Sequence, residues 1–488
     1  MSAARVPVSR ASVGLRSERG PVLLAVMLGT GLVAIDATIL AAAVPAVVGD
    51  LGGLTQFPWL FSVYLLAQAV SVPIYGKLAD LFGRKPVMMW GIGMFVLGSL
   101  LCGLAWSMGS LIAFRALQGL GAGAVQPIGM TIIGDIYSVA ERATVQGYIA
   151  GVWAVASLVG PTLGGLFADY ASWRWIFFVN LPLGAAAAWM VARKLHEQKA
   201  TTDRSRTDVD YLGAVLLALG SVLLLLALLE GGILWPWLSV TSISMFAAAG
   251  LLLVAFVLVE RRAAQPILPM WLFGHRVVGT AMLISLLVGV LLLGLTSYVP
   301  LFAQGVLGTG AVTAGFALAA MTIGWPVAAT TAGRLYLSIG FRRTMLIGSV
   351  LAAAGAALLL GVDESSSVLR LAAPCFVMGL GFGWVASPAI VAAQSAVTWH
   401  DRGVATSATV FARSVGSAVG VAAFGAIVNT SVAGQLGSVP TDLEAVTPSV
   451  LDPAIHGVFL ASAGIALVLI AAAALMPRWV PESDGDDA

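Results

Sequence analysis

Long apolar stretches separated by short polar connections run through the sequence from residue 21 to residue 476. A helix of about 20 residues crosses the ~30 Å apolar core of a bilayer, so each stretch predicts one membrane-spanning helix. If the two helices predicted within 211–259 lay at the membrane surface instead of crossing it, the chain would have twelve spans rather than fourteen. We expect fourteen spans, at residues 22–46, 57–80, 86–106, 109–133, 146–168, 174–194, 211–230, 238–259, 277–303, 312–335, 343–362, 370–393, 404–429 and 455–476.

Composition supports a membrane protein. The chain is 59% hydrophobic and 10% charged, with a mean hydropathy of +0.97, whereas a soluble domain carries about 25% charged residues. Cys102 and Cys375 lie in apolar runs and indicate neither a disulfide framework nor a metal site. The first apolar run exceeds the roughly 7–15 residues of a signal peptide's apolar region, so we expect it to stay as the first helix.

Lysine and arginine are unevenly divided between the two sides of the predicted membrane. With both termini in the cytoplasm, only Arg174 and Arg370 lie at the outer side, and Arg115 and Arg413 fall inside spans, away from the span ends. The other basic residues are cytoplasmic, as the positive-inside rule requires. We therefore expect a multi-pass protein of the bacterial inner (plasma) membrane with cytoplasmic termini.

The two halves of the sequence repeat each other. Gly76–Lys85 follows the second predicted helix, and a diverged copy, Gly333–Arg343, follows the tenth. Arg142 in the first half recurs as Arg402 in the second, at an offset of 260 residues compared with 257 for the first pair of segments. Parallel six-helix repeats are one plan of membrane transporters. The predicted parts are a cytoplasmic tail (1–20), an N-terminal six-helix bundle (21–194), a cytoplasmic linker (195–210), two additional helices (211–260), a second cytoplasmic linker (261–276), a C-terminal six-helix bundle (277–477) and an acidic cytoplasmic tail (478–488).

Asp36 is the one carboxylate well inside a predicted span. A charge at that depth costs at least about 2–3 kcal/mol, so it usually marks an ion or proton path. Arg115 lies roughly 9 Å and Asp36 roughly 15 Å from the outer surface at 1.5 Å per residue. We expect the two to form a proton-coupling pair, directly or through water. A structural Asp36 that never exchanges a proton, and an Arg115 that extends to the interface, remain open.

Three segments resemble motifs of the major facilitator superfamily. Gly76–Lys85 resembles motif A, G-x-L-a-D-r-x-G-R-[KR]. Arg115–Gly123 resembles motif B, which is associated with proton transfer. Gly151 together with Gly160–Gly165 resembles motif C, G-x(8)-G-P-x-x-G-G, which is associated with exporters. Close packing of helices through small residues is an alternative explanation of the motif C glycines, but beside motifs A and B we favour the exporter interpretation.

Two further segments resemble the fourteen-spanner drug–proton antiporter family of that superfamily. The stretch from Ala34 to Pro45 is similar to its first-helix signature, although Ala41 or Ala42 stands where the family has Asn. Trp173–Pro182 is similar to its W-R-W-I-F-x-[IV]-N-x-P segment, which we interpret as an aromatic belt at the outer interface without transport chemistry.

The resemblance implies an all-α integral membrane protein with the major facilitator fold: two six-helix bundles and two additional central helices. It implies a secondary exporter that exchanges lipophilic drugs for protons by alternating access, with no enzyme activity and no cofactor beyond the proton gradient. Arg84 would pair with Asp80 or Asp135. The expected gating residues are Gly76, Asp80, Gly83, Arg84, Lys85 and Asp135, and the expected antiporter-motif residues are Gly151, Gly160, Pro161, Gly164 and Gly165.

The substrate cavity is less defined by the sequence. Because the second half has no carboxylate inside a span, we expect a neutral, monocationic, zwitterionic or anionic lipophilic substrate. Arg413 either contacts substrate or lipid phosphate or bonds to helix carbonyls. The candidate lining residues are Thr38, Tyr64, Gln68, Gln118, Gln126, Trp153, Tyr298, Gln304, Trp325, Trp384, Phe411 and Arg413.

The expected partners are a small lipophilic substrate, protons and membrane lipids, with no nucleic acid, and we expect a monomer. Two other functions stay open. The chain could export one endogenous lipid, siderophore or antibiotic, which the same motifs would serve. It could also be a non-transporting membrane sensor or scaffold, although such a protein needs neither Asp36 nor Arg115. A membrane enzyme is disfavoured because the four histidines are scattered and no Ser/His/Asp set is evident.

Overall fold

The computed structural model describes residues 13–52, 56, 59–197, 210–231, 234–436 and 447–478. Fourteen helices in this part of the chain are long and apolar enough to cross a membrane, in agreement with the predicted fourteen spans. Side chains of residues 41, 42, 44, 45, 143, 158, 161, 169, 229, 311 and 312 also lie outside the description, and with them the Ala41, Ala42, Pro45 and Pro161 side chains.

The chain divides into two compact units. The first comprises Met1–Thr207, Val397–Ser407 and Ser483–Ala488, and the second comprises Asp208–Ala396 and Ala408–Glu482. The extra helices of the middle of the chain therefore cluster with the second unit.

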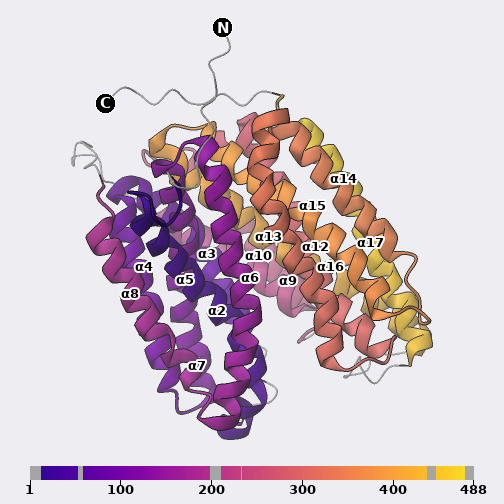
Figure 1. Cartoon of the computed structure of the whole chain (residues 1–488). Helices are drawn as coiled ribbons and strands as arrows, with labels where there is room; N and C mark the ends of the chain where they lie inside the picture. The colour runs from indigo at the N-terminus through magenta and orange to yellow at the C-terminus, as the bar shows by residue number, and fades with distance from the viewer. Residues whose placement is uncertain are drawn as a thin grey trace. The chain divides into compact units, whose positions relative to one another are not determined.

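The first unit is a helical bundle, coloured indigo to magenta in Figure 1. Within it α2 packs on α6 and α8, and α5 packs on α3 and α4. Its core contains Tyr64, Phe95, Ile128 and Tyr137. Its helices are α2 (Gly20–Leu51), α3 (Trp59–Phe82), α4 (Arg84–Gly103), α5 (Met108–Ile136), α6 (Val139–Tyr170), α7 (Trp175–Phe178) and α8 (Asn180–Lys194), followed much later by the 3₁₀ turn η2 (Trp399–Asp401).

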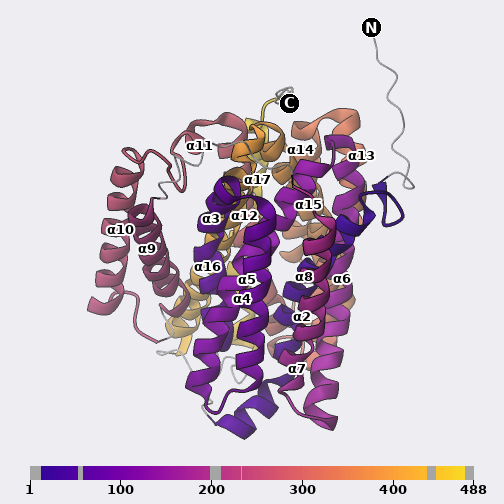
Figure 2. The same cartoon turned by 90° about the vertical axis from the view of Figure 1, so that its left-hand side faces the viewer.

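The second unit holds the remaining helices. α13 packs on α15, α14 packs on α15 and α17, and α12 packs on α17. The two additional helices, α9 and α10, lie side by side (Figure 2). The helices of this unit are α9 (Tyr211–Glu230), α10 (Val240–Glu260), α11 (Trp271–Gly274), α12 (Arg276–Gly305), α13 (Ala311–Ile339), α14 (Phe341–Leu359), α15 (Val368–Ser395), α16 (Arg402–Leu436), whose first six residues cluster with the first unit, and α17 (Pro448–Leu475).

Helix ends differ from the predicted spans where polar residues continue or interrupt a helix. The span predicted at 146–168 begins earlier, at Val139, because Ser138 and Glu141 form a reciprocal capping box at the start of α6. The span predicted at 174–194 is divided at Val179 into α7 and α8. Between α3 and α4, Gly83 has φ +97°, a left-handed conformation that suits glycine.

Candidate functional site

Asp36 and Arg115 form a direct ion pair in the interior of the first unit. Arg115 Nη1 lies 2.6 Å from Asp36 Oδ2, and both residues are 1% exposed. The pair joins α2 to α5, which are separated by two other helices in sequence. The predicted direct contact is therefore present, whereas its role in proton coupling is a separate question.

Two further polar side chains donate to this carboxylate, and a third accepts hydrogen bonds from both of them. Gln118 Nε2 donates to Asp36 Oδ1 at 2.8 Å, and Asn180 Nδ2 donates to the same oxygen at 3.1 Å. Ser99 Oγ accepts from Gln118 at 2.5 Å and from Asn180 at 3.2 Å. All three are fully buried, so Asp36 is enclosed by donors rather than by solvent.

Arg115 is equally well compensated. It donates to Gln118 Oε1 at 2.7 Å and to the Leu60 carbonyl at 3.1 Å, and its guanidinium lies 4.1 Å from the centre of the Tyr64 ring. A buried charge that loses its partner typically costs about 3–5 kcal/mol. We call Asp36, Ser99, Arg115, Gln118 and Asn180 the acid network; the carboxylate and the guanidinium in it compensate each other's charge.

The sequence prediction missed Ser99 and Asn180. Asn180 belongs to the Trp173–Pro182 segment, to which no chemistry had been assigned, and an asparagine inside an apolar run was the available signal. The same segment is held at its other end by Asp50, which accepts hydrogen bonds from Arg174 at 2.6 Å and from Trp173 at 3.0 Å. These bonds lower the pKa of Asp50 below its ordinary value.

Motif A forms a second polar cluster in the first unit. Asp80 accepts hydrogen bonds from the backbone N–H groups of Gly403 at 3.0 Å and Val404 at 2.8 Å. A carboxylate placed at a helix N-terminus satisfies unpaired donors and is favoured by the helix dipole. Asp80 thus caps α16, and Gly76 fits closely beside it, since a Cβ there would lie 2.2 Å from Ser407 Oγ.

Arg84 joins both predicted acids. Its Nη2 lies 2.9 Å from Asp80 Oδ1 and its Nε lies 2.9 Å from Asp135 Oδ2. It also donates to the Trp399 carbonyl at 2.7 Å and stacks 4.0 Å from that ring's centre. Arg84 therefore pairs with both of the acids that were predicted as alternative partners, Asp80 and Asp135. The last member of the motif, Lys85, donates to the Ala192 carbonyl at 2.7 Å.

The repeat-related arginines meet at the end of α5. Arg142 donates to the Gly134 carbonyl, and Arg402 donates to the same oxygen at 3.2 Å and to Asp135 Oδ1 at 3.3 Å. The carbonyls at a helix C-terminus attract cations. The two arginines of the internal repeat thus converge on one helix end.

The glycines of motif C differ from one another. A Cβ on Gly160 would lie 2.0 Å from Thr38 Oγ1, so this glycine allows α6 to pack closely on α2. A Cβ on Gly151 or Gly165 would meet nothing within 4 Å. Gly164 is buried. Close packing is thus the role of Gly160 in the described contacts, and it operates within the first unit.

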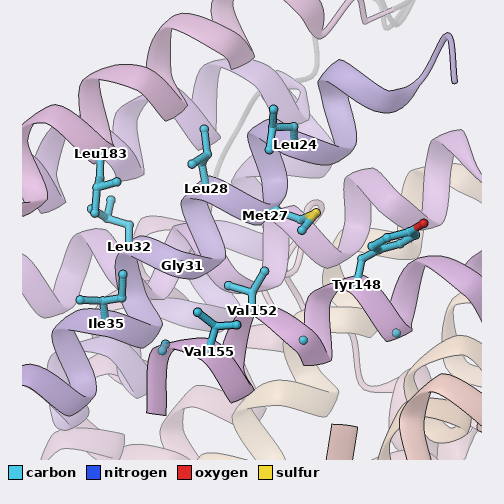
Figure 3. A pocket seen from close by; sticks show the side chains of 13 residues that line it. Leu24, Met27, Leu28, Gly31, Leu32, Ile35, Tyr148, Val152, Val155 and Leu183 are labelled. Carbon is cyan, nitrogen blue, oxygen red and sulfur yellow. The ribbon is translucent and has the colours of Figure 1, made fainter. Parts of the chain in front are cut away.

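Gly151 instead lines an apolar cavity of about 450 Å³ between α2, α6 and α8 (Figure 3). Val155 at its edge is 61% exposed, so the cavity opens at the surface of the helices. Tyr148 supplies the one side-chain hydroxyl of its lining. The other lining residues are Leu24, Met27, Leu28, Gly31, Leu32, Ile35, Gly147, Val152, Ala156 and Leu183.

None of the predicted substrate-cavity residues lines this cavity. Tyr64 and Gln118 are buried around the acid network, and Thr38 Oγ1 donates to backbone carbonyls, including that of Ala156 at 3.0 Å. Trp384 Nε1 donates to Thr331 at 2.9 Å, and Trp325 packs against Phe382. The partly exposed candidates are Thr38, Gln68, Gln126, Trp153, Tyr298, Gln304, Trp325, Trp384, Phe411 and Arg413.

Comparison with known proteins places this architecture among membrane transporters. The family model of the Major Facilitator Superfamily matches residues 26–421. The multidrug transporter protein MdtP of Bacillus subtilis (strain 168) is 36% identical over 416 residues, which cover 85% of this chain and 76% of that protein. Multidrug resistance protein 3 of the same organism is 35% identical over 406 residues, covering 83% and 79%.

A solved structure agrees on the fold. The human organic anion transporter MFSD10 (TETRAN) superposes with a TM-score of 0.68 at 14% identity, covering 93% of this chain and 99% of that one. At that identity the likeness concerns the fold alone. The predicted all-helical architecture with fourteen spans is thereby confirmed.

Proposed function

Because the chain belongs to the major facilitator superfamily, we propose that it exports lipophilic small molecules in exchange for protons. It is a multi-pass membrane protein of a transporter family whose members at 35–36% identity are multidrug transporters. The observation that carries the proposal is the acid network. It holds an ionisable carboxylate inside a membrane-spanning helix, and that carboxylate is the counter-charge of a buried arginine.

Proton binding at Asp36 would remove the negative partner of Arg115. A buried guanidinium without a counter-charge is unstable by several kcal/mol. Protonation would therefore favour a second arrangement in which Arg115 reaches water or another acceptor. Proton-coupled transport by alternating access requires an equilibrium between two arrangements of the protein, and proton binding must shift that equilibrium.

The motif A cluster is suited to gate that change. Asp80 holds the N-terminus of α16 through two backbone hydrogen bonds, and Arg84 connects it to Asp135. We assign this cluster the role of a latch that forms and breaks during the cycle. The export direction rests on the resemblance of Gly151 and Gly160–Gly165 to motif C.

A lipophilic substrate agrees with the apolar cavity and with the relatives named as multidrug transporters. We place both termini in the cytoplasm of a bacterial cell, on the distribution of lysine and arginine. The protein acts as a monomer without a bound cofactor in this proposal, and the proton gradient supplies the energy.

Transport in proteoliposomes tests the proposal. The probes are ethidium, tetraphenylphosphonium and 8-anilinonaphthalene-1-sulfonate, because each keeps one charge and a pH gradient alone cannot concentrate it. With an acidic lumen, we expect accumulation of more than one probe, which a protonophore abolishes and protein-free liposomes lack. Accumulation of equal size with and without the gradient would refute proton coupling, and transport of none of the probes would refute multidrug export.

A further inference from the structure

Arg413 is a cation deep inside a membrane-spanning helix of the second unit. It lies eleven residues beyond Arg402, the first residue of α16, or roughly 16 Å along the axis at 1.5 Å per residue. That is about the middle of a 30 Å apolar layer. An arginine at mid-depth is costly and normally has partners or faces a cavity.

Within the described chain, Arg413 makes no hydrogen bond, ion pair or ring contact. It contrasts with Arg115, which has three acceptors and an aromatic ring. The side chain is partly exposed, and its nitrogens are not among the fully buried polar atoms that lack a partner. At mid-depth the guanidinium therefore keeps some accessible surface and has no acceptor within the described chain.

The surroundings of Arg413 neither neutralise it nor let it move away. Ser414 donates to the Val410 carbonyl and Ser417 to the Gly289 carbonyl, and neither hydroxyl accepts a hydrogen bond from Arg413. The α16 backbone is pressed against α12, since a Cβ on Gly289 would lie 2.1 Å from the Arg413 carbonyl oxygen. This contact fixes the depth of the residue.

We propose that Arg413 binds the anionic group, a carboxylate or sulfonate, of an amphiphilic organic anion carried as substrate. This proposal rests on the proposed transport function and names its substrate class. A guanidinium offers five N–H donors in a planar fork that matches such groups. Arg115 is committed to its own partners instead, because three of its donor bonds go to Asp36, Gln118 and the Leu60 carbonyl and its charge is paired with Asp36.

The anion could also come from a phospholipid phosphate, which has the same chemistry. Headgroups lie at the surface of the apolar layer, about 15 Å from its middle. The depth of Arg413 therefore favours a small molecule that enters the protein. Nanodiscs of zwitterionic lipid and of anionic lipid separate the two sources, because a phospholipid ligand would compete only in the anionic nanodiscs.

Equilibrium binding of two matched probes tests the proposal. 1-Pyrenebutyrate and 1-pyrenebutanol share one ring system and differ in the head group, and both accept energy from tryptophan. In wild-type protein in zwitterionic nanodiscs at neutral pH, we expect pyrenebutyrate to bind about tenfold more tightly or better. Arg413→Gln should remove this preference and leave pyrenebutanol binding unchanged, while Arg413→Lys should keep part of it.

The control is Arg370→Gln, the same substitution at an exposed arginine of the second unit. It should bind both probes like the wild type. Unchanged pyrenebutanol binding shows that Arg413→Gln is folded. Equal binding of the two probes by the wild type, or an undiminished preference in Arg413→Gln, would overturn the anion site alone. Binding of neither probe would instead count against the proposed lipophilic transport. Loss of the preference for pyrenebutyrate in anionic nanodiscs alone would overturn the substrate site and assign it to phospholipid.

Discussion

The two oxygens of Asp36 are held by different donors. Oδ2 faces the Arg115 guanidinium, and Oδ1 receives the amides of Gln118 and Asn180. Asn180 leaves its own Oδ1 buried without a partner, so its amide has an unused acceptor beside the carboxylate. A protonated carboxyl is a donor and could use that acceptor if the amide turned. Asn180 thus fits both protonation states of Asp36.

Replacing Asn180 by alanine should therefore alter the pH dependence of transport more than its maximum rate. Loss of one donor disfavours the ionised carboxylate by about 1–3 kcal/mol, so the transport profile should move to higher pH. Gradient-driven uptake measured across a pH series checks this. Asn429→Ala, in α16, is the control and should leave the profile in place. An unshifted profile in Asn180→Ala would remove Asn180 from the coupling machinery.

The sequence predicts only part of this network. Asp36 and Arg115 stand out because each is a charge inside an apolar run. Ser99 and Asn180 do not, because neutral polar residues are common in membrane helices and hydropathy does not tell which face of a helix meets its neighbour. Their roles depend on the packing of α8 on α2 and of α4 on α5 and α8, which three-dimensional contacts alone reveal.

At the scale of whole helices, apolar length predicts the spans but not their ends. Hydropathy reports where the membrane is, and a helix can continue into polar sequence when a cap such as the Ser138–Glu141 box supports it. The glycine motif of α6 likewise could not be interpreted residue by residue from sequence. The structure separates Gly160, pressed against Thr38, from Gly151, which borders a cavity.

The different surroundings of Gly160 and Gly151 predict opposite effects when each is replaced by alanine. Gly160→Ala should destabilise the protein by about 1–3 kcal/mol, because the added methyl group overlaps Thr38 and forces α2 and α6 apart. Gly151→Ala should be neutral or slightly stabilising, because the methyl group meets open space and alanine favours the helix. Thermal unfolding of both variants in detergent checks this. Adding Thr38→Ala should partly rescue Gly160→Ala, and equal unfolding temperatures for the two single variants would refute the packing role.

At the scale of the whole molecule, charge is concentrated at the ends of helices and at a few interior sites. The acid network lies in the first unit and the unpaired Arg413 lies in the second. The internal repeat in the sequence predicted two bundles. Only the structure reveals that its two arginines, Arg142 and Arg402, donate to the same carbonyl, that of Gly134. Proton coupling and substrate recognition are thus assigned to different units.

The central claim is that Asp36 carries the proton. Its most direct test is substrate-dependent proton movement in proteoliposomes containing a pH-sensitive dye. Asp36→Asn keeps the size of the side chain but cannot ionise. The control is Asp363→Asn in a connection outside the spans, where hydrogen bonds from Ser365 and Ser366 lower the pKa of the Asp363 carboxyl.

On addition of 8-anilinonaphthalene-1-sulfonate, an amphiphilic anion, we expect proton flux with the wild type and Asp363→Asn. With Asp36→Asn we expect none, although the variant still binds substrate. Asp36→Glu, which keeps an ionisable group, should restore part of the flux and show that the position tolerates substitution. Proton flux of wild-type size in a folded, substrate-binding Asp36→Asn variant would contradict the account.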